Sequence, residues 1–155
     1  DFFGGLAIIT ITLLLASNLL LTMNDDNSFD DVRRQAHTAA DRLMSPGYPH
    51  DWNQSDVIKA GLLTDDQLNQ TKLERAGNLT YEQLRGALAV TDHVYWYYTN
   101  ATEVQNITAC GHGDPAVTTD TNCTPTLPSH GNLVRVDRLL AHDDKILRMV
   151  VITWD

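Results

Sequence analysis

Cysteine and histidine are the residues of this 155-residue chain whose side chains most readily bind metals or react. The two cysteines, Cys110 and Cys123, lie 13 positions apart, and His112 is the histidine nearest to them. A structural zinc site needs four Cys or His ligands, so this group is too small for one. The other histidines show no HExxH or similar ligand spacing: His37, His50, His93, His130 and His142.

The two cysteines are expected to form a disulfide. Both lie in residues 100–131, a stretch rich in Thr, Asn, Gly and Pro that is typical of a loop excursion. A disulfide that closes such a loop stabilises the fold by about 3 kcal/mol on a chain-entropy argument. The alternative is a pair of free thiols. Because disulfides persist outside the reducing cytosol, the pair Cys110–Cys123 indicates an exported domain.

The density of N-x-[ST] motifs also indicates an extracellular chain. One such sequon is common by chance, but six fall within 72 residues here, which favours a glycosylated surface. The alternative is a composition rich in Asn and Thr that carries no sugars. One of the six motifs contains Cys123, which makes its asparagine the least favourable acceptor. The asparagines are Asn53, Asn69, Asn78, Asn100, Asn106 and Asn122.

No motif of the chain favours catalysis. The segment CGHGD at 110–114 is a local cluster, but its cysteine is better used in the disulfide and the rest is typical of a loop. The glycine-rich stretches contain no P-loop. The segment YWYY at 95–98 fits an adhesion surface less well than a strand with one aromatic face in the core. We therefore expect no enzyme activity and no catalytic, metal or cofactor site, and N-linked glycans as the only attached groups.

The composition separates the chain into an apolar beginning and an acidic remainder. The formal net charge is −9 and the pI is about 4.9, which argues against a nucleic-acid partner because phosphates would be repelled. Apolar residues make up 43% of the chain, and many of them lie in the first 23 residues. The rest is expected to form a small globular part with a modest core.

Residues 2–23 contain no charged residue. As a helix they would span roughly 33 Å, close to the ~30 Å thickness of bilayer hydrocarbon. No Lys or Arg precedes them and no A-x-A-like site follows, so they differ from a cleavable signal peptide, and we expect a leader to have been removed before Asp1. The side chains expected in a membrane or in a filament core are Phe2, Phe3, Leu6, Ile8, Ile9, Ile11, Leu13, Leu14, Leu15, Leu19, Leu20 and Leu21.

The helix is expected to continue through residues 24–44 with one apolar stripe. Steps of three and four residues separate its apolar positions, and SPGYP at 45–49 ends the pattern. A helix over 2–44 would be about 65 Å long. Five poor helix formers at 24–28 leave two alternatives, a continuous helix with a kink or two separate helices. The stripe consists of Phe29, Val32, Ala36, Ala39, Ala40 and Leu43.

The remaining residues predict two short helices and a set of strands. One helix is expected from Thr64, as N-cap, to Gly77, and a second after Thr80. The β-branched and aromatic segment 92–100 predicts a strand. Alternation of apolar and polar residues over 132–154, with a turn at HDDK, predicts a β-hairpin.

These elements define the predicted fold class, which is α+β. A long N-terminal apolar helix is expected to be followed by a small β-rich domain packed on its C-terminal half. The domain boundaries are 1–44 for the helix, divided into a membrane or filament-core part at 1–23 and an amphipathic part at 24–44, and 45–155 for the extracellular globular domain.

Three segments together resemble archaeal type IV pilin-like proteins. They are the start DFFGGLAIITITLLLA, the turn SPGYPHDW followed by AGLL, and the closing RVDRLLAHDDKILRMVVITW. The resemblance implies a filament with N-terminal helices in its core and globular domains outside, and a subunit that waits in the membrane before assembly. Bacterial-type pilins carry a glutamate at the fifth mature position, where this chain has Gly5, so a glutamate-to-amine contact between neighbouring subunits is not expected here.

Three functions follow as hypotheses. The first is a structural subunit of an extracellular type IV pilus-like filament, a helical homopolymer whose partners are copies of itself and, before assembly, the membrane. The second is a membrane-anchored monomeric ectodomain with a binding or adhesion role. The third is an anchored enzyme, which the motifs favour least.

Overall fold

The computed structural model describes residues 28–100 and 103–155. The chain divides into two compact units, Asp1–Asp31 and Val32–Asp155. Of the first unit, the structure describes only residues 28–31, which belong to a helix covering 28–43. The second unit contains the sheet, most of this first helix and two further helices.

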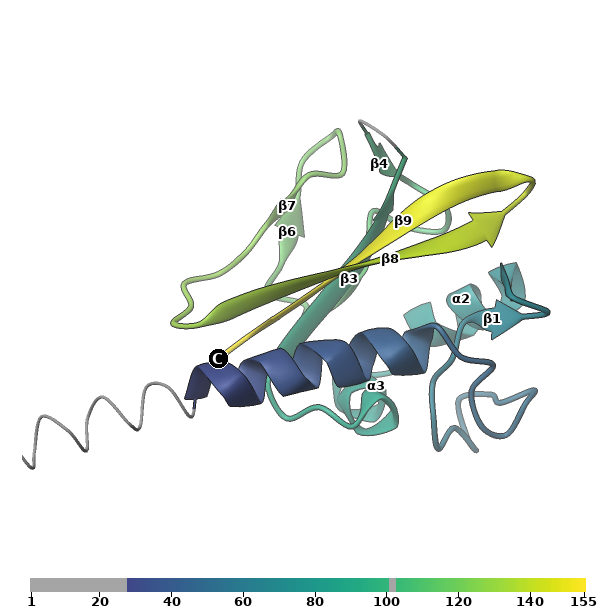
Figure 1. The fold of residues 1–155 in the computed structure, drawn as a ribbon, viewed down its shortest axis with the longest axis horizontal. Coiled ribbons are helices and arrows are strands. Elements are labelled where there is room, and N and C mark those ends of the chain that lie inside the picture. Colours follow the sequence, from purple (N-terminus) through teal and green to yellow (C-terminus); the bar gives the residue numbers. More distant parts are fainter. Residues whose placement is uncertain (1–27, 101–102) are drawn as a thin grey trace, which may run out of the picture. The chain divides into compact units, whose positions relative to one another are not determined.

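A seven-stranded mixed sheet forms the centre of the domain (Figure 1). Its order is β1-β2-β8-β9-β3-β4, with β5 also paired to β3. The β2–β8 pair is parallel and the other pairs are antiparallel. A separate two-stranded sheet consists of β6 and β7. The strand bounds are β1 Leu63–Thr64, β2 Gln67–Leu68, β3 His93–Thr99, β4 Val104–Gln105, β5 His112–Gly113, β6 Thr118–Thr119, β7 Pro125–Thr126, β8 Leu133–His142 and β9 Lys145–Trp154.

Helices pack on one face of this sheet. They are the first helix, α2 (Gln70–Gly77) and α3 (Tyr81–Leu88). Alternate side chains of β3 and β9 point into the same cluster as the helix residues, because successive residues of a strand face opposite sides. This main core includes Ala36, Ala39, Ala40, Leu43, Leu73, Leu84, Leu88, Val94, Trp96, Tyr98, Met149 and Val151.

A second, smaller cluster covers the opposite face of the same strands. It joins Tyr95, Val150, Ile152 and Trp154 with side chains that flank the β6–β7 sheet, among them Val117 and Leu127. The aromatic segment at 95–98 is therefore buried on both faces: Trp96 and Tyr98 lie in the main core and Tyr95 in the second cluster. The prediction that an aromatic face of this strand packs into the core is confirmed.

Polar bonds fasten the first helix to α3 and to the segment that leads into β3. The Gln35 side-chain oxygen accepts from the backbone N–H of Thr91 at 2.6 Å and of Asp92 at 2.9 Å. The Arg42 guanidinium donates to the carbonyl of Ala87 at 2.9 Å. Because each of these bonds joins segments more than 40 residues apart, they fix the position of the helix on the domain.

The apolar stripe of the first helix is buried as predicted from Val32 to Leu43, where each stripe residue is at most 1% exposed. Phe29 is the exception, with 43% of its surface exposed. The strand at 92–100 and the hairpin with its turn at Asp143–Asp144 are confirmed as β3, β8 and β9. The second short helix is also confirmed, with Thr80 and Gln83 forming a capping box.

The predicted fold class is wrong. Over residues 28–100 and 103–155 the structure shows three helices, the first of 16 residues, and a small β-rich domain with a mixed sheet. None of the helices within 28–100 and 103–155 is both long and apolar enough to cross a membrane. Residues 2–23 lie outside the described residues. So do residues 24–27, which belong to the segment 24–28 where a kink or a break between two helices was expected. The prediction overlooked the pairing of short strands far apart in the sequence, which no local pattern reveals.

The predicted start of the 64–77 helix is also wrong. Asp65 and Asp66 have φ of 50° and 61°, left-handed values that Asp tolerates in tight turns, and they connect β1 to β2 as a hairpin. The helix begins five residues later, where the Asn69 side chain accepts from the Lys72 N–H at 3.0 Å.

Replacing this N-cap is expected to weaken the domain. Asn69→Ala leaves an N–H of the first turn of α2 without its side-chain acceptor, which costs about 1 kcal/mol of unfolding free energy. Urea unfolding followed by circular dichroism measures the change, with Asn106→Ala, at an exposed sequon asparagine, as the control. Equal midpoints for the two variants would contradict the capping role.

Candidate functional site

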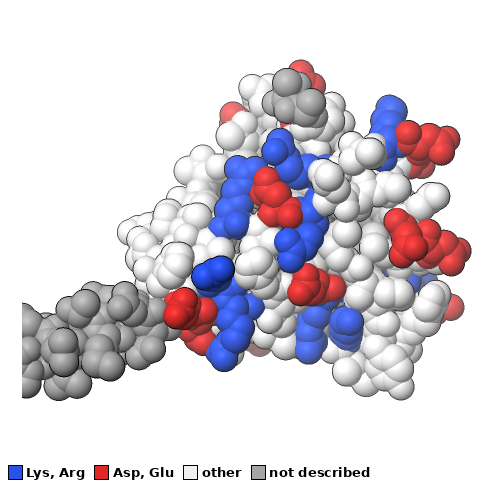
Figure 2. Space-filling model, viewed as in Figure 1, with Lys and Arg blue, Asp and Glu red and all other residues white. Residues whose placement is uncertain are grey.

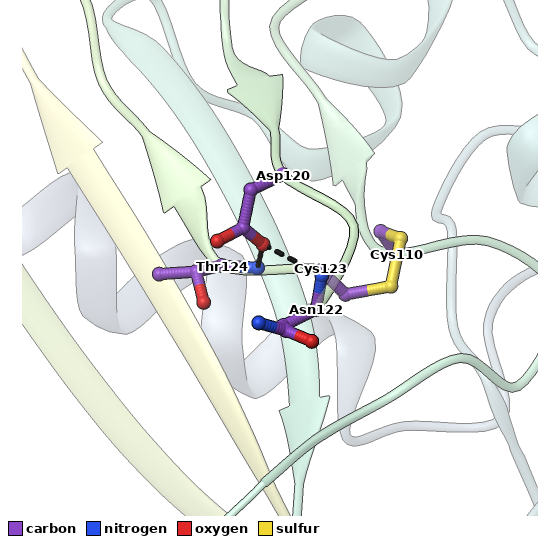
Figure 3. Close-up of a disulfide and its surroundings, with 5 residues drawn as sticks. All are labelled: Cys110, Asp120, Asn122, Cys123 and Thr124. Atoms are coloured by element: carbon purple, nitrogen blue, oxygen red, sulfur yellow. Dashed lines mark hydrogen bonds between the residues drawn. A yellow bond between two sulfur atoms is a disulfide. The ribbon is translucent and has the colours of Figure 1, made fainter.

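A disulfide joins Cys110 to Cys123, as predicted, with a Cα–Cα distance of 4.8 Å (Figure 3). Cys110 precedes β5, which pairs with β3 in the main sheet, and Cys123 lies in the turn between β6 and β7. The bond therefore attaches the β6–β7 excursion to the sheet. Since this excursion contributes to the second hydrophobic cluster, the disulfide helps to keep that cluster covered.

The Asp120 carboxylate organises the turn that presents Cys123. One of its oxygens accepts from the N–H of Asn122 at 2.9 Å and of Thr124 at 2.8 Å (Figure 3). Cys123 has a φ of 62°, a left-handed value, and its N–H donates to the Asp120 carbonyl at 3.0 Å. The turn thus holds the cysteine toward its partner by bonds that do not involve sulfur.

Two sequon asparagines line one hollow beside the disulfide. The hollow has a volume of about 670 Å³ and is lined by Glu103, Val104, Asn106, Thr121, Asn122, Cys123 and Thr124. Asn106 and Asn122 are exposed, whereas Cys123 is 7% exposed. The hollow is polar, and it lies between segments that the disulfide holds together.

Three of the other four sequon asparagines are exposed, in turns or at the end of an element: Asn53, Asn78 and Asn100. Asn69 differs, because its surface is partly buried. Its oxygen caps α2, and its nitrogen donates to the Thr64 hydroxyl at 3.2 Å. The nitrogen is the atom to which a glycan would be attached. Because the other five asparagines are exposed, Asn69 is the least accessible of the six.

The sequence did not reveal a pairing of His93 with Asp114. The His93 Nδ1 contacts the Asp114 carboxylate, which is buried, and whose other oxygen accepts from the Ala116 N–H at 2.7 Å. The His93 ring also stacks on Trp154 at 5.5 Å between centroids. Because 21 positions separate the two partners, no local pattern indicated the pair. The contact fastens the loop after β5 to the start of β3.

His112, from the CGHGD segment, lies in β5 rather than in the predicted loop. Its ring stacks on Trp96 at 5.4 Å, and its Nε2 lies 3.0 Å from the Thr108 hydroxyl. Burial lowers the pKa of His112, since the charged ring loses hydration. Thr108 is the hydroxyl residue of the Asn106 sequon, so this sequon is tied to β5.

No metal centre is evident in the part of the chain that the structure describes. Over residues 28–100 and 103–155, no group of three or more His, Cys, Asp or Glu side chains is placed to hold an ion. The twelve residues predicted for a filament core, Phe2 to Leu21, lie outside the described residues.

Comparison of the chain with protein-family models, with curated proteins and with solved structures yields no match.

Lowering the pH is expected to destabilise the domain through His112. Its pKa in the folded state lies below the unfolded value of about 6.5, so the unfolded chain binds the proton more readily. The resulting stability is present above pH 6.5 and is lost as the pH falls toward the folded pKa. Unfolding free energies at pH 7.5 and 5.5 should differ less in His112→Gln than in the unsubstituted chain.

The exposed His130 provides the matched control, since His130→Gln removes a histidine from the surface. An equal reduction of the pH dependence in both variants would mean that burial of His112 is not the cause.

Proposed function

We propose that this chain is a structural subunit of an extracellular filament of the type IV pilus kind, assembled through its apolar segment at residues 2–23. The observation that carries the proposal is the combination of 22 consecutive uncharged residues with a disulfide-bonded domain. The first feature calls for an environment without water, and the second is typical of proteins outside the reducing cytosol.

Burial of the apolar segment supplies the driving force. Removing a Leu or Ile side chain from water is worth roughly 1.5–3 kcal/mol, and the segment contains ten such residues. Lipid satisfies the same requirement, so the membrane is the proposed location before assembly. Transfer from lipid to a filament must then depend on packing, which the small residues Gly4, Gly5, Ala7, Ala16 and Ser17 permit.

The described domain supports an exported structural role. It is small, its excursion is held by a disulfide, and five of its six sequon asparagines are exposed. The resemblance of three segments to archaeal pilin-like proteins points the same way. A membrane-anchored monomer with a binding role is the alternative, and the first experiment below separates the two.

A charge in the apolar segment is expected to abolish filaments. In Leu13→Asp a carboxylate would enter a dry assembly without a partner, at a cost of several kcal/mol. Electron microscopy of sheared surface material from cells producing this variant should show no fibres containing the chain. Thr119→Asp, at an exposed site on β6, is the control and should assemble.

Export of Leu13→Asp must be verified by surface labelling, since the same charge disturbs membrane insertion. Normal filaments from an exported variant would exclude this segment as the assembly core, and the anchored monomer would replace the filament subunit as the proposal.

We also propose that the exposed domain surface carries N-linked glycans. At least three of the six sequon asparagines should be modified, with Asn69 unmodified because it is partly buried and its amide caps α2 and contacts Thr64. Mass spectrometry of glycopeptides from surface-isolated chain gives the occupancy of each site. Unmodified masses at all six would remove this proposal, and full occupancy of Asn69 would show that its amide contact opens during modification.

A further inference from the structure

The Asn122 sequon differs from the other five sequons because its middle residue is a disulfide cysteine. The motif consists of Asn122, Cys123 and Thr124, and Cys123 is bonded to Cys110. An enzyme that recognises this motif reads the asparagine amide and the hydroxyl of the last residue, so both side chains have to reach its active site together. The state of the cysteine between them therefore bears on modification of the asparagine.

The disulfide holds the middle of the sequon against the body of the domain. Cys123 is 7% exposed, whereas its neighbours Asn122 and Thr124 are exposed. The Cα atom of its partner Cys110 lies 4.8 Å away, in the chain that leads into β5 of the main sheet. Because the central residue of the tripeptide is covalently attached there, the tripeptide cannot be lifted from the domain while the bond is intact.

Backbone hydrogen bonds close the same segment into a tight turn. The Asp120 carboxylate accepts from the N–H groups of Asn122 and Thr124 (Figure 3). The Asp120 N–H donates to the Thr124 carbonyl at 3.2 Å, and Cys123 has a left-handed φ of 62°. These bonds occupy backbone groups on both sides of the cysteine. The exposure of the Asn122 side chain is therefore not sufficient to make it an acceptor in the folded chain.

The Asn53 sequon offers a matched comparison without a covalent constraint. Asn53, Gln54 and Ser55 are all exposed, and the turn that contains them has no cysteine. The Asn53 amide nitrogen donates to the exposed Asp56 carboxylate at 3.1 Å, a contact that water can replace. Binding of this sequon by an enzyme breaks only noncovalent contacts at the surface, whereas binding of the cysteine-containing sequon requires an open disulfide.

A glycan that is attached before the disulfide closes would still fit the folded domain. Asn122 and Cys123 both line the hollow of about 670 Å³ described above. Between Pro115 and Asn132 the sequence contains a single Asp, Glu, Lys or Arg residue, which is Asp120. In Figure 2 the left edge of the domain, where the chain runs from β7 to β8 in Figure 1, is correspondingly uncharged. The β6–β7 excursion thus presents little charge that a sugar would have to dehydrate.

We propose that Asn122 receives a glycan only before the Cys110–Cys123 bond forms, because the closed disulfide withholds this sequon from the glycosylating enzyme. This inference rests on the proposed N-glycosylation of the domain and names what controls one of its sites. Chains in which the disulfide closes first keep an unmodified Asn122. Chains that are modified first carry the glycan and close the disulfide afterwards.

Two covalent reactions compete for the open chain. Glycan transfer forms a bond between the Asn122 Nδ2 and the anomeric carbon of a sugar phosphate donor, while the phosphate leaves with the bonding electrons and the amide loses a proton. Disulfide closure joins the two sulfur atoms, and the two thiol protons and two electrons pass to the disulfide of an exchange partner, which becomes a dithiol. Since closure withdraws the substrate of transfer, the occupancy of Asn122 depends on the relative rates of the two reactions.

Removal of the partner cysteine tests this order of events. Cys110→Ser prevents the bond and leaves the residues of the Asn122 sequon unchanged. Mass spectrometry of glycopeptides from the unsubstituted chain should find a lower occupancy at Asn122 than at Asn53. In Cys110→Ser the occupancy of Asn122 should rise to that of Asn53. The Asn53 site is the internal control, and its occupancy should be equal in the two chains.

The partly buried Asn69 reports whether the variant retains its fold. An equal rise at Asn69 and Asn122 would assign the change to general loss of structure and overturn control by the disulfide. The same occupancy of Asn122 in the two chains would also overturn it, and modification at Asn53 would leave the glycan proposal intact. Absence of glycans from all six sequon asparagines would overturn both.

A time course with the unsubstituted chain provides a second measurement that does not depend on a variant. Newly made chains are labelled for a short period, and samples are treated at intervals with an alkylating reagent that blocks free thiols. Transfer to Asn122 should end when the cysteines no longer react with the reagent, whereas transfer to Asn53 should not depend on that time. A continued gain of glycan at Asn122 after both thiols have been consumed would overturn the proposal.

Discussion

Strand β9 has to be buried on both faces, and this constraint determines the layers of the domain. Each residue from Met149 to Trp154 is buried, and none carries a charge. A strand of this kind needs apolar cover on both sides, because its alternate side chains point in opposite directions. The first helix, α2 and α3 provide one cover, and segments flanking β6 and β7 provide the other. The Cys110–Cys123 disulfide attaches this second cover to the sheet. It therefore helps to keep the apolar side chains of β9 buried, in addition to holding the loop.

The elements that the sequence predicted correctly are those with a local signal. Alternation identified the β8–β9 hairpin, the steps of three and four identified the buried face of the first helix, and Thr80 as an N-cap residue identified the start of α3. The cysteine count identified the disulfide because two cysteines allow one intramolecular pairing.

The features that escaped prediction depend on tertiary contacts. Two-residue strands such as β4 and β5 are too short to show a periodic sequence pattern. They form because their backbones pair with the free edge of β3. The Asp65–Asp66 turn resembled an acidic first turn of a helix, since the same residue type suits both roles. His93 and Asp114 meet only because β3 and the loop after β5 are neighbours. Leu139 and Ile146 are exposed in the structure. The alternation of residues over the hairpin did not predict this, because the same sequence pattern is compatible with a buried or an exposed apolar side chain at these positions.

The bonds between the first helix and the sheet also define how the domain would carry tension. A pull transmitted along the chain from residues before Val32 reaches the carbonyl of Val32, which accepts from the buried Thr153 hydroxyl at 3.1 Å, and then Gln35, which holds Thr91 and Asp92. Thr153 and Asp92 lie at or next to the paired ends of β9 and β3. The load therefore enters the central strands directly and does not pass through the disulfide excursion.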